Sequence, residues 1–155
     1  AQMYKGDADW KPIADVKNNP RMHIPVFGNG DVDSPERALE MRHRYGLDGA
    51  MIGRASIGNP WFFNQVKYYF DNGTHCEPPT IKDRVAVAKR HLEMSIAWKG
   101  EVLGVLETRR HYTNYFKDIP NFKTYKTAMV TANHPNDVFD TFNRILEEVA
   151  EPVWF

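Results

Sequence analysis

Two short apolar runs, each followed by a glycine turn, constrain the fold of this chain more than any other feature. The runs are Ile24–Phe27 and Gly49–Ile52, followed by Gly28-Asn29-Gly30-Asp31 and by Gly53-Arg54. Runs this short do not make core helices, and their Ile, Val and Phe favour strands. We interpret both as buried parallel strands joined by a helix, which places both turns at the carboxyl ends of the strands. Ligands of α/β sheets and barrels bind at that edge.

The turns have the chemistry of an anion site. Glycine lets backbone N–H groups approach a ligand closely, and the N-terminus of a following helix favours phosphate. Arg54 adds a guanidinium suited to phosphate oxygens. The alternative, two structural turns beside a surface arginine, fits the spacing equally well. A dinucleotide fingerprint is excluded because Asp33 stands where that motif requires glycine.

Local signals predict three helices around these strands. Asp9 is a candidate cap for a helix with Trp10, Ile13 and Val16 on one face. Ser34 and Pro35 begin a helix over 35–45 that stops at Gly46, with Ala38, Met41 and Tyr45 facing the sheet. A third helix is expected over Pro60–Asp71. The order through residue 71 is therefore α-β-α-β-α.

Everything after residue 80 has a helical pattern. Ile81, Val85, Ala88, Leu92 and Ile96 recur at the helical period behind a Thr80–Asp83 capping box. A second helix is expected over about Glu101–Lys117, with Val102, Leu106, Tyr112 and Phe116 as core, and a third over Asn121–Ala132. The last begins near Pro135 and carries Val138, Phe142, Ile145 and Val149. We expect domains at 1–72 and 80–155, with a polar connector at 73–79.

Composition narrows the classes of function. The formal net charge is +0, so no global field favours nucleic acid or membrane, but residues 80–126 carry 10 basic and 5 acidic side chains. Cys76 is the single cysteine, which fits a reducing compartment and a cytoplasmic location. No apolar run is long enough to span a membrane. No histidine or cysteine spacing matches a metal motif, so we expect no metal site.

Specific motifs carry a family resemblance. GNGDVDSPERALEM, followed by GLDGAMIGRASIGNPWFF, resembles the last two strand–helix units of tRNA-dihydrouridine synthases. AQMYKGDADW resembles that family's loop after the sixth strand, and ETRRHYTNYFKDIP at 107–120 resembles its C-terminal helical domain. The resemblance implies the last two units of a (β/α)8 TIM barrel followed by a helical bundle. It also implies an FMN-dependent reduction of uridine in tRNA, with NADPH as reductant.

The resemblance assigns residues to two kinds of site. The ribityl-phosphate end of FMN falls to Asn29, Gly30, Asp31, Gly53 and Arg54. Candidate contacts to the tRNA backbone are Arg109, Arg110, Lys117, Lys123 and Lys126. Composition alone favours a solvated charged face over an RNA-contacting one for the second group. The resemblance favours RNA contact instead, because the family's helical domain contacts tRNA.

The resemblance covers only the end of the family's barrel. Its first six strand–helix units are absent, and with them the lid-loop cysteine and the residues that contact the flavin ring. We therefore assign no catalytic residue and expect the chain alone to be inactive. Unpaired strand edges predict a homo-oligomer or association with the missing N-terminal barrel portion. Two alternatives stay open: a non-catalytic RNA-binding helical module, and an FMN barrel oxidoreductase acting on a small molecule.

Overall fold

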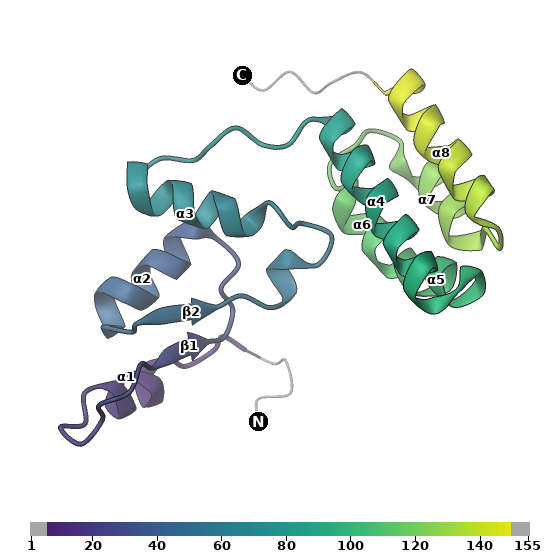
Figure 1. Ribbon diagram of the computed structural model, residues 1–155. Helices are drawn as coiled ribbons and strands as arrows, with labels where there is room; N and C mark the ends of the chain where they lie inside the picture. Colours follow the sequence, from purple (N-terminus) through teal and green to yellow (C-terminus); the bar gives the residue numbers. More distant parts are fainter. Residues whose placement is uncertain (1–5, 150–155) are drawn as a thin grey trace. The chain divides into compact units, whose positions relative to one another are not determined.

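The computed structural model describes residues 6–149 and divides the chain into two compact units, residues 1–77 and 78–155. The first unit contains α1 (Lys11–Lys17), β1 (Phe27–Asn29), α2 (Pro35–Tyr45), β2 (Gly49–Met51), η1 (Arg54–Ser56) and α3 (Phe62–Asn72) (Figure 1). The second contains α4 (Ile81–Lys99), α5 (Glu101–Thr108), η2 (Arg109–His111), α6 (Tyr112–Tyr115), α7 (Phe122–Thr131) and α8 (Pro135–Glu148). An α/β unit is thus followed by a helical one, as the sequence predicts.

The strands β1 and β2 pair in parallel, with Phe27 opposite Gly49 and Asn29 opposite Met51. The parallel pairing predicted from the sequence is confirmed, but the first strand begins at Phe27 instead of Ile24. Asp48 explains the difference. Its carboxylate accepts a hydrogen bond from the Val26 N–H at 2.7 Å, and its own N–H donates to the Val26 carbonyl at 3.0 Å. The chain before Phe27 is therefore held at Val26 by one side-chain and one backbone hydrogen bond of Asp48 instead of by a continued strand ladder.

The two faces of this small sheet differ in burial. Helix α2 packs against β2, and α3 packs against α2 (Figure 1). The core here consists of Trp10, Val32, Ala38, Met41, Leu47, Phe62 and Val66. The side chains of Phe27 and Met51 lie on the opposite face of the sheet and are 64% and 59% exposed. The expectation of fully buried strands is therefore wrong for that face, which no described element of this unit covers.

Helix ends follow the local signals in part. The Ser34 hydroxyl accepts from the Arg37 N–H at 3.2 Å, and Gly46 ends α2 with φ of 64°, as predicted. Trp10 is the N-cap residue of helix α1, and the Asp9 carboxylate one residue earlier accepts a hydrogen bond from the Lys11 N–H at 3.0 Å, in line with the capping role predicted for it. Ala14 is the buried residue of α1, whereas Val16, which the sequence pattern places on one face with Trp10 and Ile13, is exposed. Helix α3 begins at Phe62, two residues later than expected.

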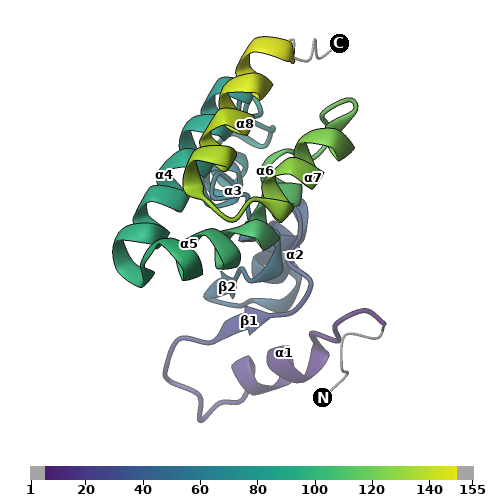
Figure 2. The ribbon, with the colours of Figure 1, turned by 90° about the vertical axis from the view of Figure 1, so that its right-hand side faces the viewer.

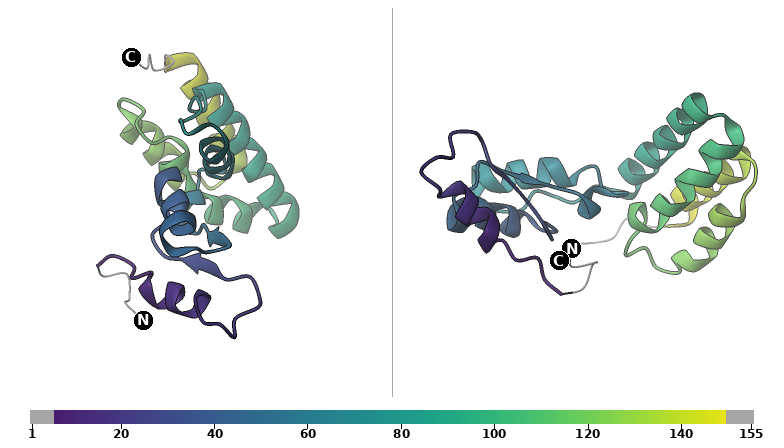
Figure 3. Two further views of the ribbon diagram at one scale, coloured as in Figure 1. Left: turned by 90° about the vertical axis from the view of Figure 1, so that its left-hand side faces the viewer. Right: turned by 90° about the horizontal axis from the view of Figure 1, so that it is seen from below.

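In the second unit, α4 packs against α5 and α8, and α7 packs against α8 (Figure 2). The Thr80–Asp83 capping box at the start of α4 is confirmed. Helices α4 and α5 meet at a tight corner at Gly100 (Figure 3). They approach so closely that a Cβ built on Gly104 would lie 2.7 Å from the Ile96 Cα. Glycine at position 104 therefore sets the spacing of this helix pair.

The single helix expected over 101–117 is wrong, since the segment forms α5, η2 and α6 in turn. Val102 and Leu106 are exposed because the contact at Gly104 turns Gly104, Val105 and Thr108 inward. The other predicted core positions of this segment, Tyr112 and Phe116, are buried. In α8 the predicted positions Val138, Phe142 and Ile145 are buried, and Val149 lies half-buried just beyond the helix end. Within residues 6–149, no helix is long and apolar enough to cross a membrane.

Candidate functional site

The two glycine turns meet at one edge of the sheet. Because β1 and β2 are parallel and in register, Gly30 and Asp31 leave β1 beside the point where Gly53 and Arg54 follow β2. A guanidinium nitrogen of Arg54 lies 2.6 Å from Oδ1 of Asp31. The structure thus brings together one residue from each predicted turn. The pair stands at the carboxyl ends of the strands, where α/β folds bind ligands.

The first turn is held in place from the N-terminal side. The second carboxylate oxygen of Asp31 accepts a hydrogen bond from the Ala8 N–H at 2.8 Å, and the Trp10 indole N–H donates to the Gly30 carbonyl at 2.9 Å. Gly30 has φ of 136°, and a Cβ there would meet the Ala8 Cβ at 2.5 Å. Only glycine satisfies both conditions. Asp31 itself adopts a left-handed φ of 48°, a conformation that aspartate tolerates better than most residues.

The charge of this edge comes from Arg54, whose side chain is 64% exposed, whereas Asp31 is 26% exposed. The Asp31 carboxylate offsets part of the arginine charge, so an incoming anion would share the guanidinium with it. The five N–H donors of a guanidinium allow such sharing. A Cβ built on Gly53 has no atom within 4 Å, so the space beside the second turn is open. The arrangement is suited to holding an anionic group and to orienting hydroxyls, with Asn29 exposed nearby.

The basic residues predicted to contact RNA divide into two groups. Arg110, Lys117, Lys123 and Lys126 are exposed. Arg109 is half-buried, and its guanidinium donates to the Ala132 carbonyl and, at 3.3 Å, to Asn133 Oδ1. Arg109 therefore ties η2 to the connection between α7 and α8, a structural role that the sequence pattern did not indicate.

A histidine pair between α4 and η2 was also missed. The rings of His91 and His111 are 4.8 Å apart, and the Tyr115 hydroxyl lies 3.0 Å from His91 Nδ1. Burial, followed by the positive charges of Arg110 and Lys99, lowers the pKa of His91. Burial, followed by His91 and Arg110, lowers the pKa of His111. A sequence separation of 20 residues carries no signal for this pairing. Among residues 6–149, no three His, Cys, Asp or Glu side chains are placed to hold a metal ion.

A family model described as "Dihydrouridine synthase (Dus)" matches residues 1–150. The chain belongs to this family. It is 32% identical over 150 residues to the probable tRNA-dihydrouridine synthase of Rickettsia conorii, covering 97% of this chain and 45% of the relative. It is 33% identical over 156 residues to tRNA-dihydrouridine synthase B of Xanthomonas campestris, covering 98% and 46%. The corresponding protein of Pseudomonas putida is 35% identical over 126 residues, covering 81% and 37%. The chain thus spans less than half the length of these relatives.

Proposed function

We propose that this chain is the C-terminal portion of an FMN-dependent tRNA-dihydrouridine synthase, in which uridine of tRNA is reduced with NADPH as reductant. Membership of the dihydrouridine synthase family over residues 1–150 carries the proposal. In it, β1, α2, β2 and α3 are the last two strand–helix units of a TIM barrel. The helical unit then contributes tRNA contacts. Reduced FMN, when bound in the whole enzyme, supplies the hydride.

The meeting of the two glycine turns supports a role in holding FMN. Arg54 offers exposed donors to the phosphate oxygens, and the open space beside Gly53 leaves room for the group. Asp31 already accepts from Ala8 and pairs with Arg54, so we assign it to positioning Arg54 and to ribityl hydroxyls, not to the phosphate. Asn29 and Gly30 complete the proposed set. The residues present fit the phosphate end of the cofactor.

The exposed basic residues support a role in binding the tRNA backbone. Arg110, Lys117, Lys123 and Lys126 carry the proposal, and Arg109 contributes by fixing the fold around them. Contacts of this kind release counterions, so affinity for tRNA should fall steeply as the salt concentration rises.

The family's catalytic cysteine has no counterpart here, because Cys76 lies in the segment between α3 and α4. The chain by itself should therefore not turn over uridine.

The test is a chimera in which this chain replaces the matching C-terminal portion of the Rickettsia conorii relative. We expect the purified chimera to retain flavin and to form dihydrouridine in tRNA, whereas the chain alone forms none. Arg54→Lys is the matched variant, since it keeps the charge but removes the planar fork. Multiple turnovers by the isolated chain would contradict the proposal that the catalytic cysteine lies outside this chain. Salt-dependent tRNA binding by a folded chimera without any flavin would favour the RNA-binding module instead.

A further inference from the structure

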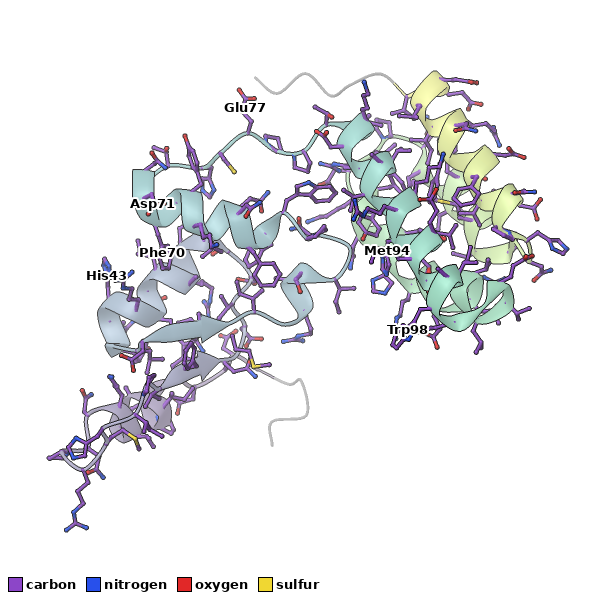
Figure 4. All side chains as sticks on the ribbon, viewed as in Figure 1. His43, Phe70, Asp71, Glu77, Met94 and Trp98 are labelled. Carbon is purple, nitrogen blue, oxygen red and sulfur yellow. The ribbon has the colours of Figure 1, made fainter. Side chains whose placement is uncertain are left out.

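The last turn of α4 carries an unusually exposed tryptophan. Trp98 is 82% exposed, and Met94, one turn earlier, is 60% exposed. Figure 4 shows both side chains projecting from the same side of the helix. Leu103 at the start of α5 is also exposed. A large aromatic ring in water costs free energy that burial against a ligand would recover, so this surface is a candidate contact site.

A cation already lies against the ring. The Lys99 ammonium is 4.8 Å from the Trp98 ring centroid, and the same ammonium pairs with the carboxylate of Glu107 on α5. This double contact fixes the lysine beside the indole and connects the end of α4 to α5. Most of the indole surface nevertheless stays open to solvent. The ring is therefore held near a positive charge and is available for stacking.

Further charges lie on α4 with Trp98 and Met94, and on the neighbouring elements α5 and η2. Arg90 precedes Met94 by one turn of α4, and Arg110 on η2 donates to the His111 ring at 3.4 Å. Exposed Glu93 and the lysine-paired Glu107 lie on these elements, and exposed Glu101 begins α5 with its carboxylate 3.6 Å from His134 Nδ1. Arg90, Lys99 and Arg110 equal these carboxylates in number, but Glu107 pairs with Lys99 and Glu101 lies against His134, and residues 80–126 as a whole carry 10 basic and 5 acidic side chains. An exposed aromatic ring among cations is the combination that binds single-stranded nucleic acid, because bases stack and phosphates pair.

We propose that Trp98 is a stacking platform for an unpaired nucleobase of RNA, with Lys99 and Arg110 contacting the adjacent phosphates. This inference rests on the proposed function, since it assumes that the helical unit contacts tRNA. It adds that the contact includes a single-stranded or flipped-out base in addition to the backbone. A protein partner is the competing occupant. The interleaved cations favour RNA, because the centre of a protein interface is depleted of charged residues.

The experiment measures binding of the full chain to a tRNA transcript and to a labelled single-stranded RNA, across a salt series. We expect Trp98→Ala to weaken both complexes about tenfold at every salt concentration without changing the salt slope, and Trp98→Phe to recover most of the loss. Arg110→Ala should instead reduce the slope of log affinity against log salt concentration. Tyr68→Ala, which removes an exposed aromatic from α3, is the matched control and should leave affinity unchanged. The exposure of Trp98 makes the variant's fold easy to preserve, and circular dichroism checks it.

Two results would overturn the proposed stacking role of Trp98. One is equal RNA affinity of Trp98→Ala and the unaltered chain. The other is a sedimentation coefficient that differs between Trp98→Ala and the unaltered chain in the absence of RNA, which would assign the surface to a protein partner. The proposed function is judged separately, by Lys117→Ala, Lys123→Ala and Lys126→Ala. If these weaken tRNA binding while Trp98→Ala does not, only the platform fails. If the unaltered chain shows no salt-dependent tRNA binding, the proposed RNA contact and the platform both fail.

Discussion

Asp31 and Arg54 belong to turns that follow different strands, yet their side chains pair at 2.6 Å. Asp31 simultaneously binds the Ala8 N–H, so one carboxylate connects three segments of the chain. The guanidinium of Arg54 is thereby oriented before any ligand arrives. A positioned arginine loses less side-chain entropy on binding an anion than a freely moving one.

Replacing Arg54 with Ala should weaken flavin retention by the chimera described above by at least about tenfold, because a charge-assisted hydrogen bond is worth roughly 1.5–3 kcal/mol. Arg54→Lys should recover part of the affinity. The measurement is equilibrium dialysis of FMN against each purified variant. Equal retention by the unaltered and Ala proteins would remove Arg54 from the proposed site.

Asp31 should behave differently from Arg54 in the same dialysis. Asp31→Ala removes both the Ala8 hydrogen bond and the arginine pair, so flavin retention should fall. Asp31→Asn keeps an oxygen acceptor for the Ala8 N–H but removes the negative charge that pairs with Arg54. It should therefore retain more flavin than the Ala variant. Retention by Asp31→Ala equal to that of the unaltered protein would contradict the positioning role.

The open face of the two-stranded sheet should drive self-association of the isolated chain. Phe27 and Met51 expose apolar surface there, and each strand has one edge without a strand partner among the described residues. Met51→Lys places a charge on that face and should shift the chain towards monomer in sedimentation velocity. Leu146→Lys alters an exposed apolar residue of α8, 45% exposed, and is the control. A chain that sediments as a monomer without any substitution would refute this prediction.

Gly104→Ala should destabilise the helical unit by about 1–3 kcal/mol, the usual cost of overpacking. The added methyl would press on the Ile96 backbone at 2.7–2.8 Å, and backbone cannot swing aside as a side-chain end can. Urea unfolding followed by far-UV circular dichroism measures the effect. Leu103→Ala, an exposed position on the same helix, should stay within about 0.5 kcal/mol of the unaltered chain. Similar unfolding midpoints for the two variants would contradict the close helix contact.

The stability of the helical unit should fall as pH drops from about 7.5 to about 5.5, the range around the ordinary histidine pKa of roughly 6.5. Burial, followed by nearby positive charge, lowers the pKa of His91 and of His111 in the folded chain. The unfolded chain therefore binds more protons in this range, so the free energy of unfolding decreases as pH falls. A His91→Gln, His111→Gln double variant should show a flatter dependence in urea unfolding. An equal slope in both proteins would show that other groups are responsible.

Local chemistry predicted several of the helix ends, whereas tertiary contacts decided the remainder. Ser34, Gly46 and the Thr80–Asp83 box act through neighbouring backbone groups, so the sequence alone identifies them. The start of β1 depends on Asp48, 22 residues away from Val26, and no short-range pattern contains that bond. The exposed faces of Val102 and Leu106 depend on how closely α4 approaches Gly104.

The candidate site shows the same division. The glycine turns and Arg54 were recognisable because the motif and its place after a strand are local features. The pairing of Arg54 with Asp31 also required the parallel register of the strands. The hydrogen bonds of Arg109 were not predicted because its partners, the Ala132 carbonyl and Asn133, lie 23 and 24 residues further along the chain.

The division of the chain into units at residue 77 has an evolutionary consequence. The core of the first unit is built from residues between Trp10 and Val66, so substitutions on α4 or α5 leave it untouched. Selection can therefore change the surface around Trp98 while the turns at Asp31 and Arg54 are inherited unchanged. The two units can therefore accumulate substitutions independently of each other.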